Sequence, residues 1–407
     1  MNDSKPAERR SLLRSLGPGF ITAAVVIGPG SITVASKIGA SAGMSLLWAI
    51  IVAGSFMMLF TSMSARIGVL NKQSLLTVTA FHYGRWLAVL MGLLAFTVCA
   101  SFQMGNYLAC ATALATLTGL GEMAWIGIVG AMALAFIFAA RRLYQAIEKV
   151  MLALVIVMLA AFIGNLLVAR PNVLDMLSGL IPRAWPTGMT GLVTAMVATT
   201  FSVIAALYQS TLAQQKGWGA HDLRTGLRDT LAGIGVLVGI SLVITMTAAT
   251  VLRGSTIDNA ATLAAQLQPL LGNTAVILFS LGFLAASFSS TVVNAMIGGG
   301  LLADSLGMES NINATPTRLF TAVGMAVGMA AGFYTLGTGT PIEGIVIAQK
   351  TTILAVPLCA LVMILLANDR RVVGEHRNSL GANAWASLAF LVLLAMSVFR
   401  ILEMVGK

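Results

Sequence analysis

The feature that most constrains this chain is a succession of apolar segments, each of about 20 residues or longer, separated by short polar loops. Only helices and closed β-barrels satisfy every backbone polar group in lipid, and barrel strands would read as alternating segments of about 10 residues. Charged residues make up 9% of the 407 residues, whereas soluble globular proteins carry roughly 25%. The sequence therefore predicts an all-α polytopic membrane protein.

Eleven spans are predicted, and they group into two five-helix repeats followed by one further span. Segment 1–15 is the polar N-terminus, 16–168 the first repeat, 187–366 the second repeat, and 383–404 the eleventh span. The individual spans are expected at 16–40, 45–70, 87–118, 122–140, 147–168, 187–214, 229–252, 273–300, 318–335, 341–366 and 383–404.

The distribution of lysine and arginine predicts the orientation of these spans. With the N-terminus in the cytoplasm, seventeen of the 24 Lys and Arg residues fall in inside segments and five in outside segments. Cytoplasmic loops of membrane proteins carry such an excess. The net charge of +10 is therefore read as orientation bias and not as a sign of nucleic-acid binding. We expect a multi-pass protein of the plasma (inner) membrane, surrounded by the lipid bilayer, with its C-terminus outside.

Two of the predicted spans are interrupted. The first contains Gly28-Pro29-Gly30-Ser31, and the sixth contains a polar cluster from Thr199 to Ser202. Glycine is flexible, and proline removes a backbone donor and clashes with the preceding turn. Interrupted helices at matching places in two repeats indicate a transporter site between the repeats. The alternative is an ordinary kink between packed helices.

Polar and charged residues within the spans are the further candidates for a site. The uncharged candidates are Ser31, Thr33, Gln103, Asn106, Thr199, Thr200, Ser202, Tyr208, Gln209 and Gln349. Two lysines, Lys37 and Lys350, lie inside spans, where a charge suggests a function. Lys350 either faces the cavity and holds an anionic substrate, or snorkels to an interface or pairs with a carbonyl. Lys37 is read as a vestibule or interface lysine.

Several motifs resemble those of the Nramp family of divalent-metal transporters. The resemblance rests on GPGF at 17–20, GPGS at 28–31, MSARIGV at 63–69, FSLGFLAASFSSTV at 279–292 and TPIEGIVIAQ at 340–349. It implies a LeuT-like fold with inverted five-plus-five repeats, broken helices 1 and 6, and alternating access.

The resemblance also implies where the substrate site lies. The family motif at the first break reads Asp-Pro-Gly-Asn, and Gly28 and Ser31 stand here at its Asp and Asn positions. The Met-Pro-His motif of the sixth span corresponds to 203–205, whereas Gln349 keeps its polar identity. The expected substrate-binding residues are Gly28, Gly30, Ser31, Ser202, Val203, Ala205, Gln349 and Lys350.

These residues predict a secondary transporter with an altered site. Carboxylate, thioether and imidazole ligands hold Mn²⁺ or Fe²⁺, and they are missing at the matched positions, so a typical Mn²⁺/Fe²⁺ transporter is not expected. The substrate is either a loosely bound divalent ion such as Mg²⁺ or a small anion or polar solute. A transport-inactive sensor or scaffold is the alternative. The spans offer no nucleophile–base pair, so no enzyme activity and no cofactor are expected.

Overall fold

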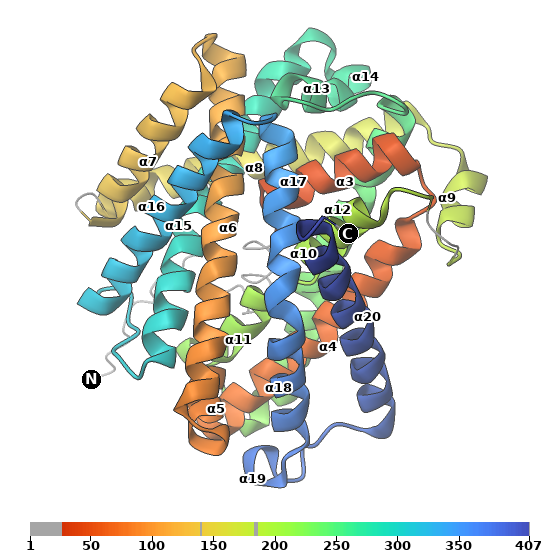
Figure 1. Cartoon of the computed structure of the whole chain (residues 1–407). Helices are drawn as coiled ribbons and strands as arrows, with labels where there is room; N and C mark the ends of the chain where they lie inside the picture. The colour runs from red at the N-terminus through yellow and green to blue at the C-terminus, as the bar shows by residue number, and fades with distance from the viewer. Residues whose placement is uncertain (1–26, 139–140, 183–185, 407) are drawn as a thin grey trace, which may run out of the picture.

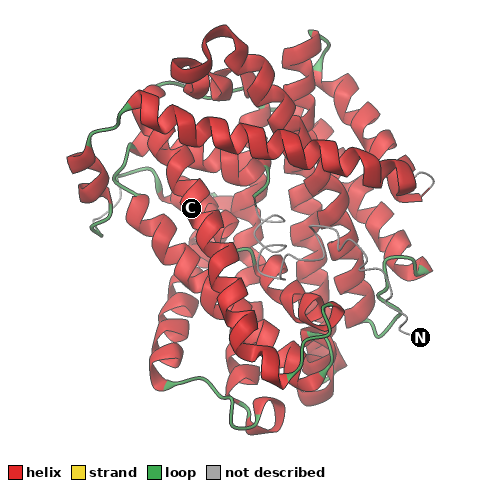
Figure 2. Ribbon diagram, turned by 180° about the vertical axis from the view of Figure 1, so that it is seen from behind, coloured by secondary structure: helices red, strands yellow, loops and turns green. Residues whose placement is uncertain are grey.

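The computed structural model describes residues 27–138, 141–182 and 186–406, and within these ranges the regular structure is helical, with no strand (Figures 1 and 2). The predicted N-terminal segment 1–15, the motif at 17–20 and the first part of the span predicted at 16–40 lie outside the described residues.

The α-helices form an upright bundle with short helices at its two ends (Figure 1). Their bounds are α3 Pro29–Ala42, α4 Leu47–Asn71, α5 Leu75–Tyr83, α6 Arg85–Thr118, α7 Glu122–Phe138, α8 Arg141–Ala169, α9 Val173–Gly179, α10 Thr190–Thr200, α11 Val203–Gln215, α12 Leu223–Val251, α13 Ala260–Ala264, α14 Gln268–Leu271, α15 Ala275–Ser305, α16 Thr315–Leu336, α17 Pro341–Thr352, α18 Val356–Asn368, α19 Arg370–Val373 and α20 Leu380–Met404.

Nine helical segments in the described ranges are long and apolar enough to cross a membrane. The other two predicted spans correspond to α3 and α7. Helix α3 is 14 residues long because it begins at Pro29, after the break at Gly28, and α7 is 17 residues long. The part of the first predicted span before residue 27 lies outside the described ranges. The predicted number of eleven spans therefore stays a prediction.

The backbone is irregular at both predicted interruptions. Gly28 is extended, with φ −112° and ψ −174°, and α3 begins at the following Pro29. In the sixth span α10 ends at Thr200, and the ψ angles of Phe201 and Ser202 are 82° and 100°, outside the helical range. Ser202 then caps α11, because its hydroxyl accepts a hydrogen bond from the backbone N–H of Ala205 at 3.4 Å.

The tenth span also contains an irregular turn, although the sequence analysis treated 341–366 as uninterrupted. A 3₁₀ turn at Ile353–Ala355 separates α17 from α18. Pro357 lies in the first turn of α18 and has no N–H to donate to the preceding turn. At the other end of α17, the side chains of Thr340 and Glu343 form a capping box that fixes its start.

Glycines let neighbouring helices approach closely. Helix α3 packs against α12, and α6 packs along α15. A Cβ atom added to Gly39 on α3 would lie 2.3 Å from the backbone oxygen of Thr245 on α12. Small residues at such crossings allow the backbones to pack in lipid, where no hydrophobic effect drives helix association.

We predict that Gly39→Ala lowers the stability of the protein by roughly 1–3 kcal/mol, because the backbone of α3 or α12 must shift to admit the methyl group. Gly235→Ala on α12 is the matched control, since a Cβ there meets nothing within 4 Å. This control should leave stability unchanged or raise it by up to about 1 kcal/mol through helix propensity. Thermal unfolding of the two purified variants measures the difference, and equal midpoints would contradict the prediction.

Candidate substrate site

A small polar pocket lies where the two broken helices meet. Its volume is about 20 Å³, which is room for one water molecule or one bare ion. Residues of five predicted spans line it: Gly28, Pro29, Gly30, Ser31, Phe102, Asn106, Thr199, Ser202, Ser290, Asn294 and Gln349. Of the described residues that line this break pocket, none carries an ionisable side chain.

Close contacts define the shape of the break pocket. The hydroxyls of Ser31 and Thr199 lie 3.0 Å apart and join the two broken helices directly. A Cβ atom on Gly30 would lie 1.9 Å from Nε2 of Gln349, and one on Gly28 would lie 3.0 Å from the Ser290 hydroxyl. The two glycines therefore let the α17 and α15 side chains reach the broken backbone.

Two polar atoms at the break pocket are buried without a hydrogen-bond partner among the described residues. They are Oε1 of Gln349 and Nδ2 of Asn106. Buried polar groups are almost always hydrogen-bonded, and an exception calls for a ligand, a water or a functional explanation. The two residues lie on different helices and line the same small pocket. The arrangement therefore fits a binding site for a polar ligand.

The structure brings together five of the eight expected site residues: Gly28, Gly30, Ser31, Ser202 and Gln349. Val203 and Ala205 do not line the break pocket; they are buried in the apolar core at the start of α11. Among the other polar candidates, Asn106 and Thr199 line it. Gln103 instead donates a hydrogen bond to the backbone oxygen of Thr291 at 2.8 Å.

Lys350 does not line the break pocket. Its Nζ lies 3.0 Å from a Glu403 carboxylate oxygen, and the other oxygen of Glu403 lies 2.7 Å from Arg400. Gln349 and Lys350 are neighbours on α17, so their side chains point about 100° apart around the helix. Gln349 faces the break pocket, whereas the contacts of Lys350 with Glu403 of α20 and with Gly191 of α10 show that it faces these two helices. The interpretation of Lys350 as a cavity charge is therefore corrected to an ion pair.

The sequence analysis did not single out three lining residues, Phe102, Ser290 and Asn294. Ser290 lies inside the 279–292 motif, but it was not weighed as a site residue. Asn294 follows Ser290 by four positions and shares its face of α15. This spacing of two polar residues in an apolar span is a signal by which Ser290 and Asn294 can be found in the sequence.

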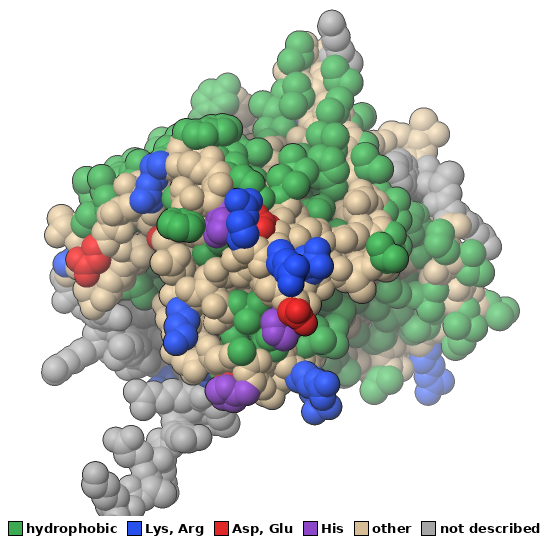
Figure 3. Space-filling view, turned by 90° about the horizontal axis from the view of Figure 1, so that it is seen from below, with side chains coloured by type: hydrophobic (Ala, Val, Ile, Leu, Met, Phe, Trp, Pro, Cys, Tyr) green, Lys and Arg blue, Asp and Glu red, His purple; other side chains and the backbone are tan. Residues whose placement is uncertain are grey.

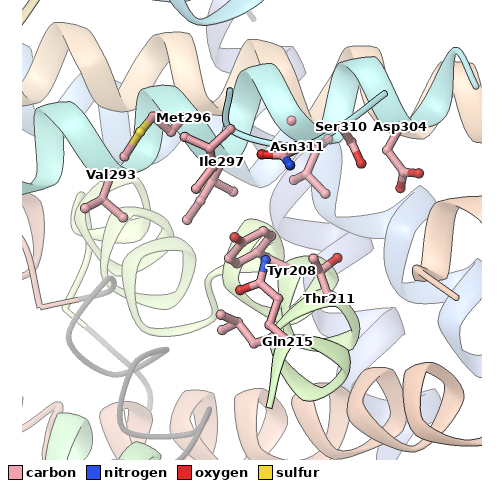
Figure 4. Close-up of a pocket in the computed structure, with 13 residues that line it drawn as sticks. Tyr208, Thr211, Gln215, Val293, Met296, Ile297, Asp304, Ser310 and Asn311 are labelled. Atoms are coloured by element: carbon pink, nitrogen blue, oxygen red, sulfur yellow. The ribbon is translucent and has the colours of Figure 1, made fainter. Parts of the chain in front are cut away.

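A larger cavity of about 460 Å³ lies beside the break pocket, between α11 and α15. Figure 4 shows Val293, Met296 and Ile297 on α15 facing Tyr208 and its neighbours on α11. Val293 and Ile297 lie next to Ser290 and Asn294, which line the break pocket, along the same helix. The cavity continues toward Asp304 at the end of α15, the end predicted to be cytoplasmic.

The segment that contains α13 and α14 is hydrogen-bonded to α3 and α8. Gln266 in this segment is fully buried and exchanges hydrogen bonds of 3.1 and 3.2 Å with Ser36 of α3. Asn165 of α8 donates to the Gln266 backbone oxygen at 2.7 Å and accepts from the backbone N–H of Leu270 at 2.9 Å. These hydrogen bonds hold the α13–α14 segment against α3, the helix that begins at the first break, and against α8.

The chemistry available at the break pocket is that of neutral donors and acceptors. Hydroxyl and carboxamide groups surround it, and the described residues contain no cluster of three or more His, Cys, Asp or Glu side chains that could hold a metal ion. Because α10 ends at the break, its last backbone carbonyls have no N–H donors from a following helical turn.

Comparison with known proteins decides the family. The family model described as natural resistance-associated macrophage protein-like, Nramp, matches residues 19–403. The chain belongs to the Nramp family. The protein named Divalent metal cation transporter MntH of Deinococcus radiodurans is 24% identical over 413 aligned positions, which cover 98% of this chain and 92% of that protein.

Solved structures share the fold of this Nramp chain. A crystal structure of a variant of the Eremococcus coleocola manganese transporter superposes with a TM-score of 0.78 at 15% identity, covering 98% of this chain and 90% of that one. The structure of MhsT in complex with L-phenylalanine gives a TM-score of 0.63 at 13% identity, with 93% and 98% covered. These likenesses confirm the predicted LeuT-like class, whereas the repeat boundaries 16–168 and 187–366 stay a prediction.

We predict that Glu403→Gln destabilises the protein by about 1–3 kcal/mol, because it leaves Lys350 and Arg400 without their shared carboxylate. The double variant Lys350→Met/Glu403→Gln should recover part of this loss, since one of the two uncompensated cations is gone. Glu309→Gln, in an exposed loop, is the control. Thermal unfolding in detergent measures all three, and an unchanged Glu403→Gln midpoint would show that the pair contributes nothing.

Proposed function

We propose that this chain is a secondary transporter that works by alternating access, with the break pocket as its substrate site. The observation that carries the proposal is the position of this pocket. It lies between two helix breaks, and the α15 residues that line it are next along the helix to those that line the α11–α15 cavity. Broken helices at mid-membrane depth are tolerated where they line a cavity, and in transporters they form the substrate site.

The substrate that we propose for this site is a divalent cation that keeps part of its water shell, such as Mg²⁺. Because the break pocket has room for one water molecule or one bare ion, it must widen during transport to admit the retained waters. Hydroxyl, carboxamide and backbone oxygens are hard ligands suited to Mg²⁺, Ca²⁺ and Mn²⁺, and Mg²⁺ commonly retains several waters when bound. The freed carbonyls at the end of α10 add partial negative charge, which opposes the partial positive charge of the N-termini of α3 and α11 at the same breaks. The relative in Deinococcus radiodurans, whose name describes a divalent metal cation transporter, supports this class.

A small neutral polar solute is the second candidate, favoured by the lack of formal charge on the lining side chains. An anionic substrate loses its main support, because Lys350 is paired with Glu403 and faces away from the break pocket. As part of the same proposal, the chain resides in the plasma membrane with its N-terminus in the cytoplasm, as the Lys and Arg distribution predicts.

The test is uptake into proteoliposomes that contain the purified protein and a fluorescent Mg²⁺ or Mn²⁺ indicator. Saturable Mg²⁺ uptake is expected. Uptake of a polar solute such as a small amide, without any response to metal, would favour the second candidate. Absence of both uptake and binding would overturn transport and leave the alternative of a membrane sensor or scaffold.

We predict that Gly30→Ala lowers this uptake at least about tenfold, because the new methyl group would displace the Gln349 carboxamide from the break pocket. Gly235→Ala, which meets open space, should transport like the wild type. Comparison of initial rates at equal reconstituted protein measures the effect. Equal rates for Gly30→Ala and the wild type would show that the Gln349 position does not matter for the substrate.

We also predict that Gly28→Asp tightens Mn²⁺ binding by about tenfold or more, because it adds a carboxylate to a set of neutral oxygen donors. Gly28→Asn is the control of the same shape without charge, and it should bind Mn²⁺ as weakly as the wild type. Calorimetric titration measures both variants. Tight Mn²⁺ binding by the wild type would mean that the neutral ligands already suffice.

A further inference from the structure

A further cavity, separate from the break pocket and from the α11–α15 cavity, lies at the end of the molecule where α18 and α19 meet. We name it the arginine cavity. It has a volume of about 440 Å³ and lies between the second half of α4, the start of α12 and the loop after α19. Three of its lining side chains are Arg66, Arg224 and Arg377, and Trp218, Glu375 and His376 also line it. Figure 3 shows Lys, Arg and His side chains gathered on this end of the molecule.

The positive charge of the arginine cavity is not balanced. Three arginines face one acidic lining residue, Glu375. Within the described ranges, none of the three arginines has a salt-bridge partner, because the ion pairs there join other residues. Three guanidinium groups in one hollow repel one another, and an anion placed among them would relieve this repulsion.

Two buried donors at the arginine cavity have no partner among the described residues. The half-buried Arg66 donates to the side-chain oxygen of Asn378 through one terminal nitrogen, whereas its Nε is buried without a partner. The hydroxyl of Thr230 is also buried and unpartnered, although the residue lines the cavity. Leaving a buried charged group incompletely bonded is costly, so such atoms indicate an acceptor that binds there.

We propose that the arginine cavity binds a phosphate-bearing anion. The planar guanidinium fork matches the geometry of phosphate oxygens, and bidentate contacts to phosphate are among the strongest hydrogen bonds in proteins. The volume exceeds that of a bare phosphate and lies in the range of small-molecule pockets. The ligand is either the headgroup of an anionic lipid or a free phosphate compound, since both present the same chemistry to the arginines.

The surroundings of the arginine cavity suit a site at a membrane surface. Trp218 packs so closely on α12 that a Cβ atom on Gly226 would lie 2.7 Å from its ring. Tryptophan is enriched at the level of lipid headgroups. The lining segments belong to the side predicted to be cytoplasmic, where basic pockets meet anionic lipids. None of the lining residues is shared with the break pocket, so this proposal does not rest on the transport substrate.

The test measures thermal unfolding of the full-length protein in nanodiscs. One series uses phosphatidylcholine with increasing phosphatidylglycerol, and the other uses phosphatidylcholine alone with added inorganic phosphate. A saturable rise of the midpoint is expected in at least one series. A rise with phosphatidylglycerol alone identifies a lipid headgroup, whereas a rise with inorganic phosphate identifies a free anion. No saturable rise in either series overturns the proposal.

Matched variants distinguish anion binding in the arginine cavity from a general effect of positive surface charge. Arg224→Gln/Arg377→Gln removes two exposed arginines of the cavity, so folding should be retained. It should need roughly tenfold more ligand for the same midpoint shift, because charge-assisted hydrogen bonds are lost. The control Arg228→Gln/Arg370→Gln removes the same charge from exposed positions outside the cavity and should respond like the wild type. An equal loss in both double variants would overturn the proposal.

Discussion

The constraint on which the rest of this structure depends is that a backbone in lipid must bond its own polar groups. It forces the chain into helices, and it makes each interruption of a helix costly unless the interruption lies inside the bundle. The breaks at Gly28 and at Phe201–Ser202 meet this condition, because both are enclosed by other helices. The pocket that they create is therefore a direct consequence of where the helices cannot continue.

Glycine positions then determine how close other helices come to the breaks. Gly30 leaves space for the Gln349 carboxamide, and Gly39 brings α3 against the backbone of α12. A larger side chain at Gly30 would displace the Gln349 carboxamide, and one at Gly39 would require the backbone of α3 or α12 to move. Glycine therefore allows the helix to break, and it also allows α17 to line the break pocket and α3 to pack against α12.

Charge is distributed away from the centre of the molecule. The break pocket is lined by neutral groups, Lys350 is paired with Glu403, which it shares with Arg400, and the three arginines of the arginine cavity lie at one end of the molecule. A transporter whose centre carries no fixed charge relies on dipoles, carbonyls and retained water to hold an ion. Under the proposed function, this arrangement favours a weakly bound substrate over a tightly bound one.

The sequence by itself determined the membrane helices, the two breaks and the family motifs, because helix length, glycine and proline act locally. It also predicted Gly28, Gly30, Ser31, Ser202 and Gln349 as site residues, and these five line the break pocket. Only the tertiary structure decided that Gln349 and not Lys350 faces the pocket, that Lys350 meets Glu403 53 residues away, and that Ser290 and Asn294 complete the lining. Helical periodicity predicts which residues share a face of a helix. Which neighbouring helix that face contacts depends on how the helices pack in three dimensions.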